Sequence, residues 1–263
     1  MAAMAGADDG GEPARVGALA VLQAVGLAVL FAVGAVLGLA LGLVIFPISL
    51  SRGARAVHAE GIVCRGWITA RGPAGVPLAG PALVRLSGAF EPQVTARPDV
   101  LGVAIRMQRS ATGDARDGDQ DVLLGSFESF HTAGRDRAHT QTGDYLANGY
   151  STVTPWWLPG HGPQILRLVP PPPRPAERAT DRPARLDADL AAGTARFELV
   201  IDAAGARQVI AELRLIERLA IDGRRLAVSM FRQGRRLRPL GLRNGLRATV
   251  YPISQIARRM RGG

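Results

Sequence analysis

The residues best suited by type to do chemistry are His58, Arg55, Arg85 and Ser87. A histidine beside a hydroxyl group can take up and release a proton, because its unperturbed pKa lies near neutral pH. Two arginines that line one cavity can hold carboxylate groups through paired hydrogen bonds. The first two residues belong to the segment RAVHAEGIVCRGWITA, and the other two to PALVRLSGAF. The same residues also fit an ordinary first strand with a structural histidine, and the pattern alone leaves both interpretations open.

Other chemistries find little support in the composition. The single cysteine, Cys64, excludes an internal disulfide, and four scattered histidines argue against a structural zinc site. All 32 basic residues are arginine, so a standard P-loop with its lysine is excluded. No Gly-x-Ser-x-Gly motif of the serine hydrolases occurs. We therefore predict no metal-ligating residues.

The elements that position these residues are short strands. Aliphatic and β-branched runs, separated by Gly and Pro clusters, favour an antiparallel barrel or sandwich. Residues 142–150 are expected to form a helical turn or two. The proline-rich stretch 169–185 is expected to form an excursion loop within one domain. The expected strands are 61–70, 81–90, 101–108, 121–127, 195–203, 208–218 and 224–230.

A membrane segment precedes this domain. Residues 16–46 contain no charged side chain, and about 20 apolar residues suffice to cross a bilayer as a helix. We predict a polar tail over 1–15, a single transmembrane helix over 16–47 and the domain over 52–263. By the positive-inside rule, the domain is expected on the cytoplasmic side, because several arginines follow the span: Arg52, Arg55, Arg65 and Arg71.

Two features suggest partners. Gly34, Gly38 and Gly42 repeat every four residues, which permits close approach of another helix and self-association, although glycine is common in membrane helices anyway. Residues 224–263 carry 11 arginines and no acidic residue, which fits either an anionic lipid surface or a solvated basic face. Without a nucleic-acid-binding motif and with few aromatic residues, the chain is not expected to bind nucleic acid.

The order of several blocks resembles the opening of the catalase superfamily. RAVHAEG matches a family pattern Arg-x-x-His-Ala-x-Gly, VRLS matches a strand that ends Val-Arg-Phe-Ser, and DVLGVAIR matches an Asp-x-x-Gly-x-Ala block that ends in a basic residue. YLANGYSTVTPWWLPG and RPLGLRNGLRATVY are similar to later elements of small catalase-like proteins. The resemblance covers residues 52–258 in patches.

This resemblance implies a fold and a set of roles. The fold is an α+β, catalase-like antiparallel β-barrel with flanking helices and a haem bound against it. His58 would be the distal acid–base residue that moves a proton between the peroxide oxygens, and Ser87 would orient its imidazole. Arg55 and Arg85 would pair with the haem propionates.

The chain also departs from the family pattern. Gly125 and Ser126 stand where catalases place a distal asparagine. Tyr251, four residues after Arg247, is the one late tyrosine, but its block matches a C-terminal element other than the iron-binding one, so no iron ligand is predicted. Two hypotheses follow: a membrane-anchored, haem-dependent peroxide-consuming enzyme, or a haem-less binding or structural module at the membrane.

Overall fold

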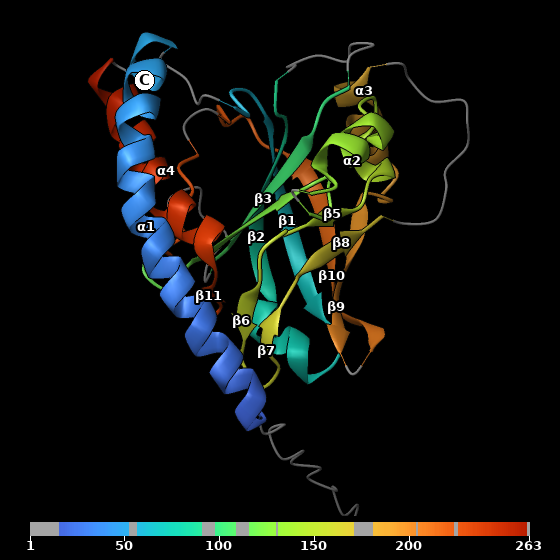
Figure 1. Ribbon diagram of the computed structural model, residues 1–263. Coiled ribbons are helices and arrows are strands. Elements are labelled where there is room, and N and C mark those ends of the chain that lie inside the picture. The colour runs from blue at the N-terminus through green and yellow to red at the C-terminus, as the bar shows by residue number, and fades with distance from the viewer. Residues whose placement is uncertain are drawn as a thin grey trace, which may run out of the picture.

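The centre of the molecule is a closed antiparallel barrel (Figure 1). The computed structural model describes residues 16–52, 57–90, 98–108, 116–129, 131–170, 181–203, 205–223 and 226–261. Within these residues the barrel has eight strands in the order β1-β10-β9-β8-β5-β4-β3-β2. The predicted α+β class, with a β-barrel, flanking helices and a long apolar N-terminal helix, is confirmed. The predicted tail 1–15 lies outside the described residues.

The barrel strands form from the apolar runs identified in the sequence. They are β1 (Ile62–Ala70), β2 (Gly80–Gly88), β3 (Leu101–Met107), β4 (Gln120–Gly125), β5 (Tyr150–Ser151), β8 (Arg167–Val169), β9 (Arg196–Ala203) and β10 (Ala206–Arg218). A small second sheet contains β6 (Trp156–Leu158), β7 (Gly162–Gln164) and β11 (Arg238–Pro239). The helices are α1 (Ala18–Arg52), α2 (Ala133–His139), α3 (Arg182–Ala191) and α4 (Leu242–Met260), with 3-10 turns η1 (Pro73–Leu78) and η2 (Tyr145–Ala147).

Burial differs between the two sides of the barrel. Strands β1 and β10 largely alternate between buried and exposed residues, as expected where one face packs on the core and the other meets water. Every residue of β3 is buried, and so are the last seven of β2, because their outward face is covered as well. On β2 the inward residues Val84 and Leu86 join the main core, whereas Arg85 and Ser87 alternate with them and take the other face. The covered outer face of β2–β4 is where the site lies.

The observed secondary structure differs from the expected bounds in three segments. Residues 226–230 form an irregular segment rather than part of a strand over 224–230. The long helix continues through Pro47 to Arg52 instead of ending at 47. The expected loop 169–185 reaches into α3, and its residues 171–180 lie outside the described part of the chain. The helical turn expected within 142–150 is present as η2.

Helices α1 and α4 pack side by side along one flank of the barrel (Figure 1). Their contact uses the glycine face of α1: an added Cβ at Gly34 would lie 1.8 Å from the Leu242 carbonyl oxygen, and one at Gly38 would lie 2.0 Å from the Thr249 hydroxyl. The predicted close approach of a second helix is therefore made by α4 of the same chain. Self-association through this face stays a prediction, and it would require α4 to move away.

The buried thiol of Cys64 supplies a prediction about pH and stability. Burial raises the pKa of Cys64 from about 9 to about 12, so the native protein keeps the thiol protonated. A raised acid pKa stabilises the fold fully below about pH 9, and this contribution is lost between about pH 9 and about pH 12. Because the thiolate is the reactive form, alkylation of Cys64 at pH 8 should follow global unfolding. Mass spectrometry across a urea series checks this, and rapid labelling of the native protein would contradict it.

Candidate functional site

A cavity of about 490 Å³ lies between the outer face of β2–β4 and the helix pair α1–α4. Its size falls within the range of ordinary cofactor and ligand sites. The barrel contributes Arg85, Ser87 and Gly102 to one wall, and His58 lies on the same wall just before β1. Leu41 of α1, with its neighbour Ile45, adds an apolar side. Most of the remaining lining is apolar, so charged groups in the wall act in a poorly solvated space.

His58 is held in an uncommon backbone conformation. Its φ angle is 54°, in the left-handed region that non-glycine residues seldom adopt and that costs about 1–3 kcal/mol. Three hydrogen bonds fix it: its backbone N–H donates to the Ala89 carbonyl (2.8 Å), its carbonyl accepts from Arg85 Nη2 (2.7 Å), and its ring Nδ1 contacts Ser87 Oγ (3.0 Å). The chain thus maintains an unfavourable backbone angle at the residue whose ring faces the cavity.

The contact with Ser87 sets the chemistry of the imidazole. Ser87 Oγ accepts from Arg85 Nη1 at 3.1 Å, and its second lone pair can accept a proton donated by His58 Nδ1. In that tautomer His58 Nε2 carries a lone pair and can act as a general base. Ser87, only 2% exposed, is therefore placed to orient the ring.

Arg85 connects three parts of the site. Besides its bonds to His58 and Ser87, its Nε donates to the Gly223 carbonyl at 2.9 Å. Gly61 leaves room for this guanidinium, because an added Cβ there would lie 2.8 Å from Cζ of Arg85. Burial is the main cause that lowers the pKa of Arg85 to about 10, and the positive charge of Arg258 acts in the same direction. An anionic group in the cavity would relieve this repulsion.

The opposite wall comes from α4. Arg247, Tyr251 and Arg258 lie at i, i+4 and i+11 of this helix and all line the cavity. Spacings of four and seven residues return to the same helix face, which explains why the three side chains gather there. The cavity therefore has a histidine and a serine on the barrel side, and a tyrosine with two arginines on the helix side.

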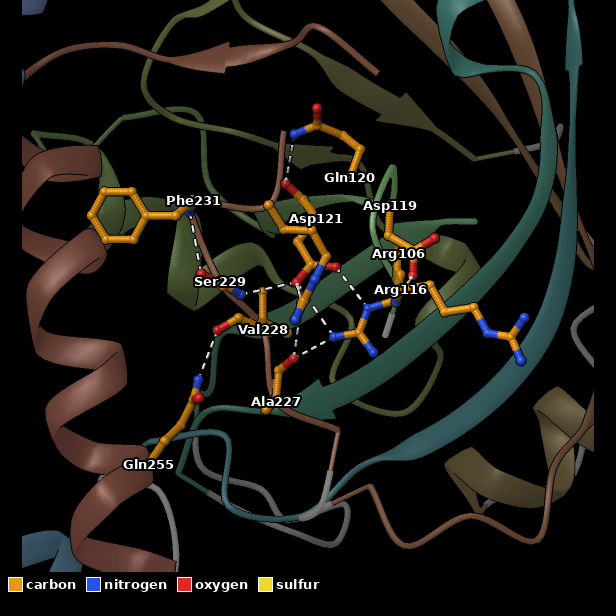
Figure 2. A network of polar contacts seen from close by, with 11 residues as sticks. Arg106, Arg116, Asp119, Gln120, Asp121, Ala227, Val228, Ser229, Phe231 and Gln255 are labelled. Carbon is orange, nitrogen blue, oxygen red and sulfur yellow. Dashed lines mark hydrogen bonds and ion pairs between the residues drawn. The ribbon is translucent and has the colours of Figure 1, made fainter. Parts of the chain in front are cut away.

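A buried polar network fixes α4 and its neighbours against the barrel (Figure 2). Asp121 of β4 forms an ion pair with Arg106 of β3 at 2.9 Å, accepts from the Ser229 backbone N–H at 2.9 Å and also pairs with Arg232. The Gln255 side chain of α4 donates to the Val228 carbonyl at 2.8 Å. The irregular segment 226–232 is thus held on one side by the barrel and on the other by α4.

The structure brings together three of the four residues singled out in the sequence. His58, Arg85 and Ser87 lie in one hydrogen-bonded group at the cavity, whereas Arg55 lies outside the described residues. Gly125 also lines the cavity. The helix wall was not predicted. The sequence feature that could have indicated this wall is the Arg–x–x–x–Tyr spacing of Arg247 and Tyr251. The block that contains these two residues resembles a different C-terminal element, and the spacing was therefore not used.

Gly102 gives a test of how the ring is positioned. A Cβ at this position would lie 2.6 Å from His58 Cε1, so Gly102→Ala should displace the imidazole from Ser87 while leaving the barrel folded. In the matched control, Gly134→Ala, the added Cβ meets nothing within 4 Å. The Nδ1 and Nε2 resonances of His58 in a ¹⁵N NMR spectrum should shift in the first variant and stay in place in the second. Unchanged resonances in Gly102→Ala would contradict the described ring position.

Comparisons with known proteins do not identify a family. A scan against protein-family models finds no match, and a search of curated proteins finds no relative. The residues and geometry of the cavity are therefore the basis on which a function can be inferred.

Proposed function

We propose that the cavity binds haem and that the chain consumes peroxide at a membrane, with His58 as the acid–base residue. The single observation that carries this proposal is that one cavity is lined by His58 and Ser87 on the barrel side and by Tyr251 on the α4 side. This arrangement agrees with the resemblance of the sequence to the catalase superfamily, in which a tyrosine holds the haem iron.

The residues present fit such a group. Tyr251 is the side chain that would hold the iron, and the apolar lining from β3, β4 and α1 would contact the ring. Arg85 and Arg258 are buried cations that would pair with the propionates, and the neighbouring charge of Arg258 already lowers the pKa of Arg85. Bound haem would supply the oxidation–reduction chemistry of peroxide cleavage.

The chain's own residues would handle the proton. His58 Nε2 would accept a proton from one peroxide oxygen and deliver it to the other, while Ser87 holds Nδ1 and keeps the ring in place. Arg85 keeps both residues in register through its bonds to the His58 carbonyl and to Ser87 Oγ. Gly125 stands where the catalase pattern has an asparagine, so this side-chain amide is missing from the site. Proton transfer would therefore depend more heavily on His58.

Membrane attachment belongs to the same proposal. Helix α1 is long and apolar enough to cross a bilayer, and we propose that it anchors the enzyme. For a helix that crosses the bilayer, the arginines that follow it favour a cytoplasmic domain.

Haem titration of the full chain in detergent tests the cofactor. A Soret band that saturates at one haem per chain supports the proposal, and the Arg85→Ala, Arg258→Ala pair should weaken binding at least tenfold. Arg218→Ala, at an exposed ion pair with Asp187, is the matched control and should leave binding unchanged. If no saturable Soret band forms under any loading condition, the result would contradict the enzyme hypothesis and favour the haem-less binding module.

A further inference from the structure

We propose that α1 lies in the plane of an anionic bilayer, with its outward face in the lipid, instead of crossing the membrane. The proposal depends on how α1 meets the rest of the chain and not on haem or on peroxide chemistry. In this proposal α1 is not the single transmembrane helix that its length and composition alone suggest.

Helix α1 is docked along nearly its whole length. The partly or fully buried positions recur at helical spacing and form one continuous inward line: 16, 20, 24, 27, 31, 34, 35, 38, 42, 45, 46, 49 and 50. From Ala20 to Ser49 this line extends for about 44 Å at 1.5 Å per residue. Gly162 of β7 lies beside Ala20, and the Ser49 and Ser254 hydroxyls are hydrogen-bonded at 2.7 Å. In Figure 1, α1 follows the flank of the domain from the level of α4 down to β7.

Polar contacts connect α1 to the domain between these ends. The Leu27 carbonyl accepts from the Gly241 N–H at 2.9 Å, and the Ala35 carbonyl accepts from the Thr249 hydroxyl at 3.0 Å. Successive contacts are therefore separated by far fewer than the 20 residues that a crossing needs. If α1 crossed a bilayer while docked, α4 would enter the hydrocarbon with Arg243 and Arg247, and arginine is among the costliest residues there.

The opposite face of α1 is exposed and apolar. Gln23 is the one strongly polar side chain from residue 16 to residue 46. A helix that lies in a membrane interface normally has a polar face that is turned away from the lipid. In α1 the domain covers that face, so the helix does not need polar side chains there. The large outward residues include Leu19, Leu22, Val25, Val29, Val36, Leu39, Leu43 and Val44.

Charge at one end of the helix pair fits anionic lipid headgroups. Helices α1 and α4 run parallel, since Gly34 lies beside Leu242 and Gly42 beside Ile253. Their C-terminal ends therefore lie together, and the Arg261 guanidinium donates to the Leu50 carbonyl at 3.0 Å. Exposed residues at this end combine cations with apolar side chains: Arg52, Ile256, Arg259, Met260 and Arg261. Such a cluster suits the headgroup level of a negatively charged leaflet.

Depth measurements on the full chain distinguish the two placements. A thiol-reactive fluorophore is attached to single cysteines at four outward positions spaced by seven residues: Leu22, Val29, Val36 and Leu43. Native Cys64 can remain, because it is buried and its pKa is raised. The variants are reconstituted in vesicles of phosphatidylcholine and phosphatidylglycerol that contain nitroxide lipids labelled near the headgroup or near the bilayer centre.

The in-plane proposal predicts the same depth at all four positions, with stronger quenching by the shallow nitroxide than by the deep one. Replacing phosphatidylglycerol with phosphatidylcholine should weaken vesicle binding of the detergent-free protein. A graded profile, in which Val29 and Val36 are quenched best by the deep nitroxide and the outer two by the shallow one, would establish a crossing and overturn the proposal. Labels that no nitroxide quenches, whether in water or covered by a second copy, would overturn it as well.

Discussion

The His58→Ala variant should consume peroxide about 10²–10⁴-fold more slowly than the native protein at equal haem content. The reason is that His58 is the imidazole in the cavity wall, held by Ser87 and by Arg85, and no other described lining residue is a histidine. The variant should keep its Soret band, since the proposed iron ligand and the cavity arginines are unchanged. Initial rates of peroxide loss, normalised to haem absorbance, check this expectation.

A control variant at another histidine tests whether the loss of turnover is specific to His58. His139 is exposed at the end of α2, away from the cavity, and His139→Ala should retain the native rate. Turnover in His58→Ala within threefold of the native rate would remove His58 from its assigned role, even if haem is bound.

The Asp121→Ala variant should lower the free energy of unfolding by about 3–5 kcal/mol. Asp121 is 1% exposed, and its carboxylate neutralises the buried Arg106, which is 4% exposed. Removing it leaves that guanidinium buried beside a second cation, Arg232, and releases the Ser229 N–H. Urea unfolding of the full chain in detergent, followed by tryptophan fluorescence, measures the change.

An exposed ion pair provides the comparison for Asp121. Asp187 contacts Arg218 at 3.2 Å, and both side chains are about half exposed. Asp187→Ala should therefore change the free energy of unfolding by less than about 1 kcal/mol. If Asp121→Ala cost no more than this control, the network in Figure 2 would not be what holds segment 226–232 against the barrel.

The strands of the barrel could be predicted from the sequence because local signals agreed with the final structure, although these signals left a barrel and a sandwich equally open. Most long strands begin or end at Gly or Pro clusters and carry β-branched residues, so β1, β2, β3, β9 and β10 follow the expected runs within a few residues. The stretch 226–230 looks like a strand by composition, but Asp121 and Gln255 bind its backbone instead of a neighbouring strand. Tertiary contacts there outweigh the local preference.

The helix wall of the cavity is harder to predict. Helix α4 contains Gly245 and Pro252, both of which have unfavourable propensity inside helices. The glycine spacing of α1 indicates a closely packed partner helix but does not say which one. Nothing in the local pattern brings Tyr251 opposite His58, nearly 200 residues earlier in the chain. That proximity comes from the docking of α4 beside α1 on the flank of the barrel.

The most direct test of the haem proposal is the resonance Raman spectrum of the haem-loaded protein. An iron–phenolate vibration should be present in the native protein and in His58→Ala, and absent in Tyr251→Phe, which keeps the ring and removes only the hydroxyl. A vibration that persists in Tyr251→Phe, or one that is missing from the haem-loaded native protein, would contradict the assignment of Tyr251 and the account of the cavity built on it.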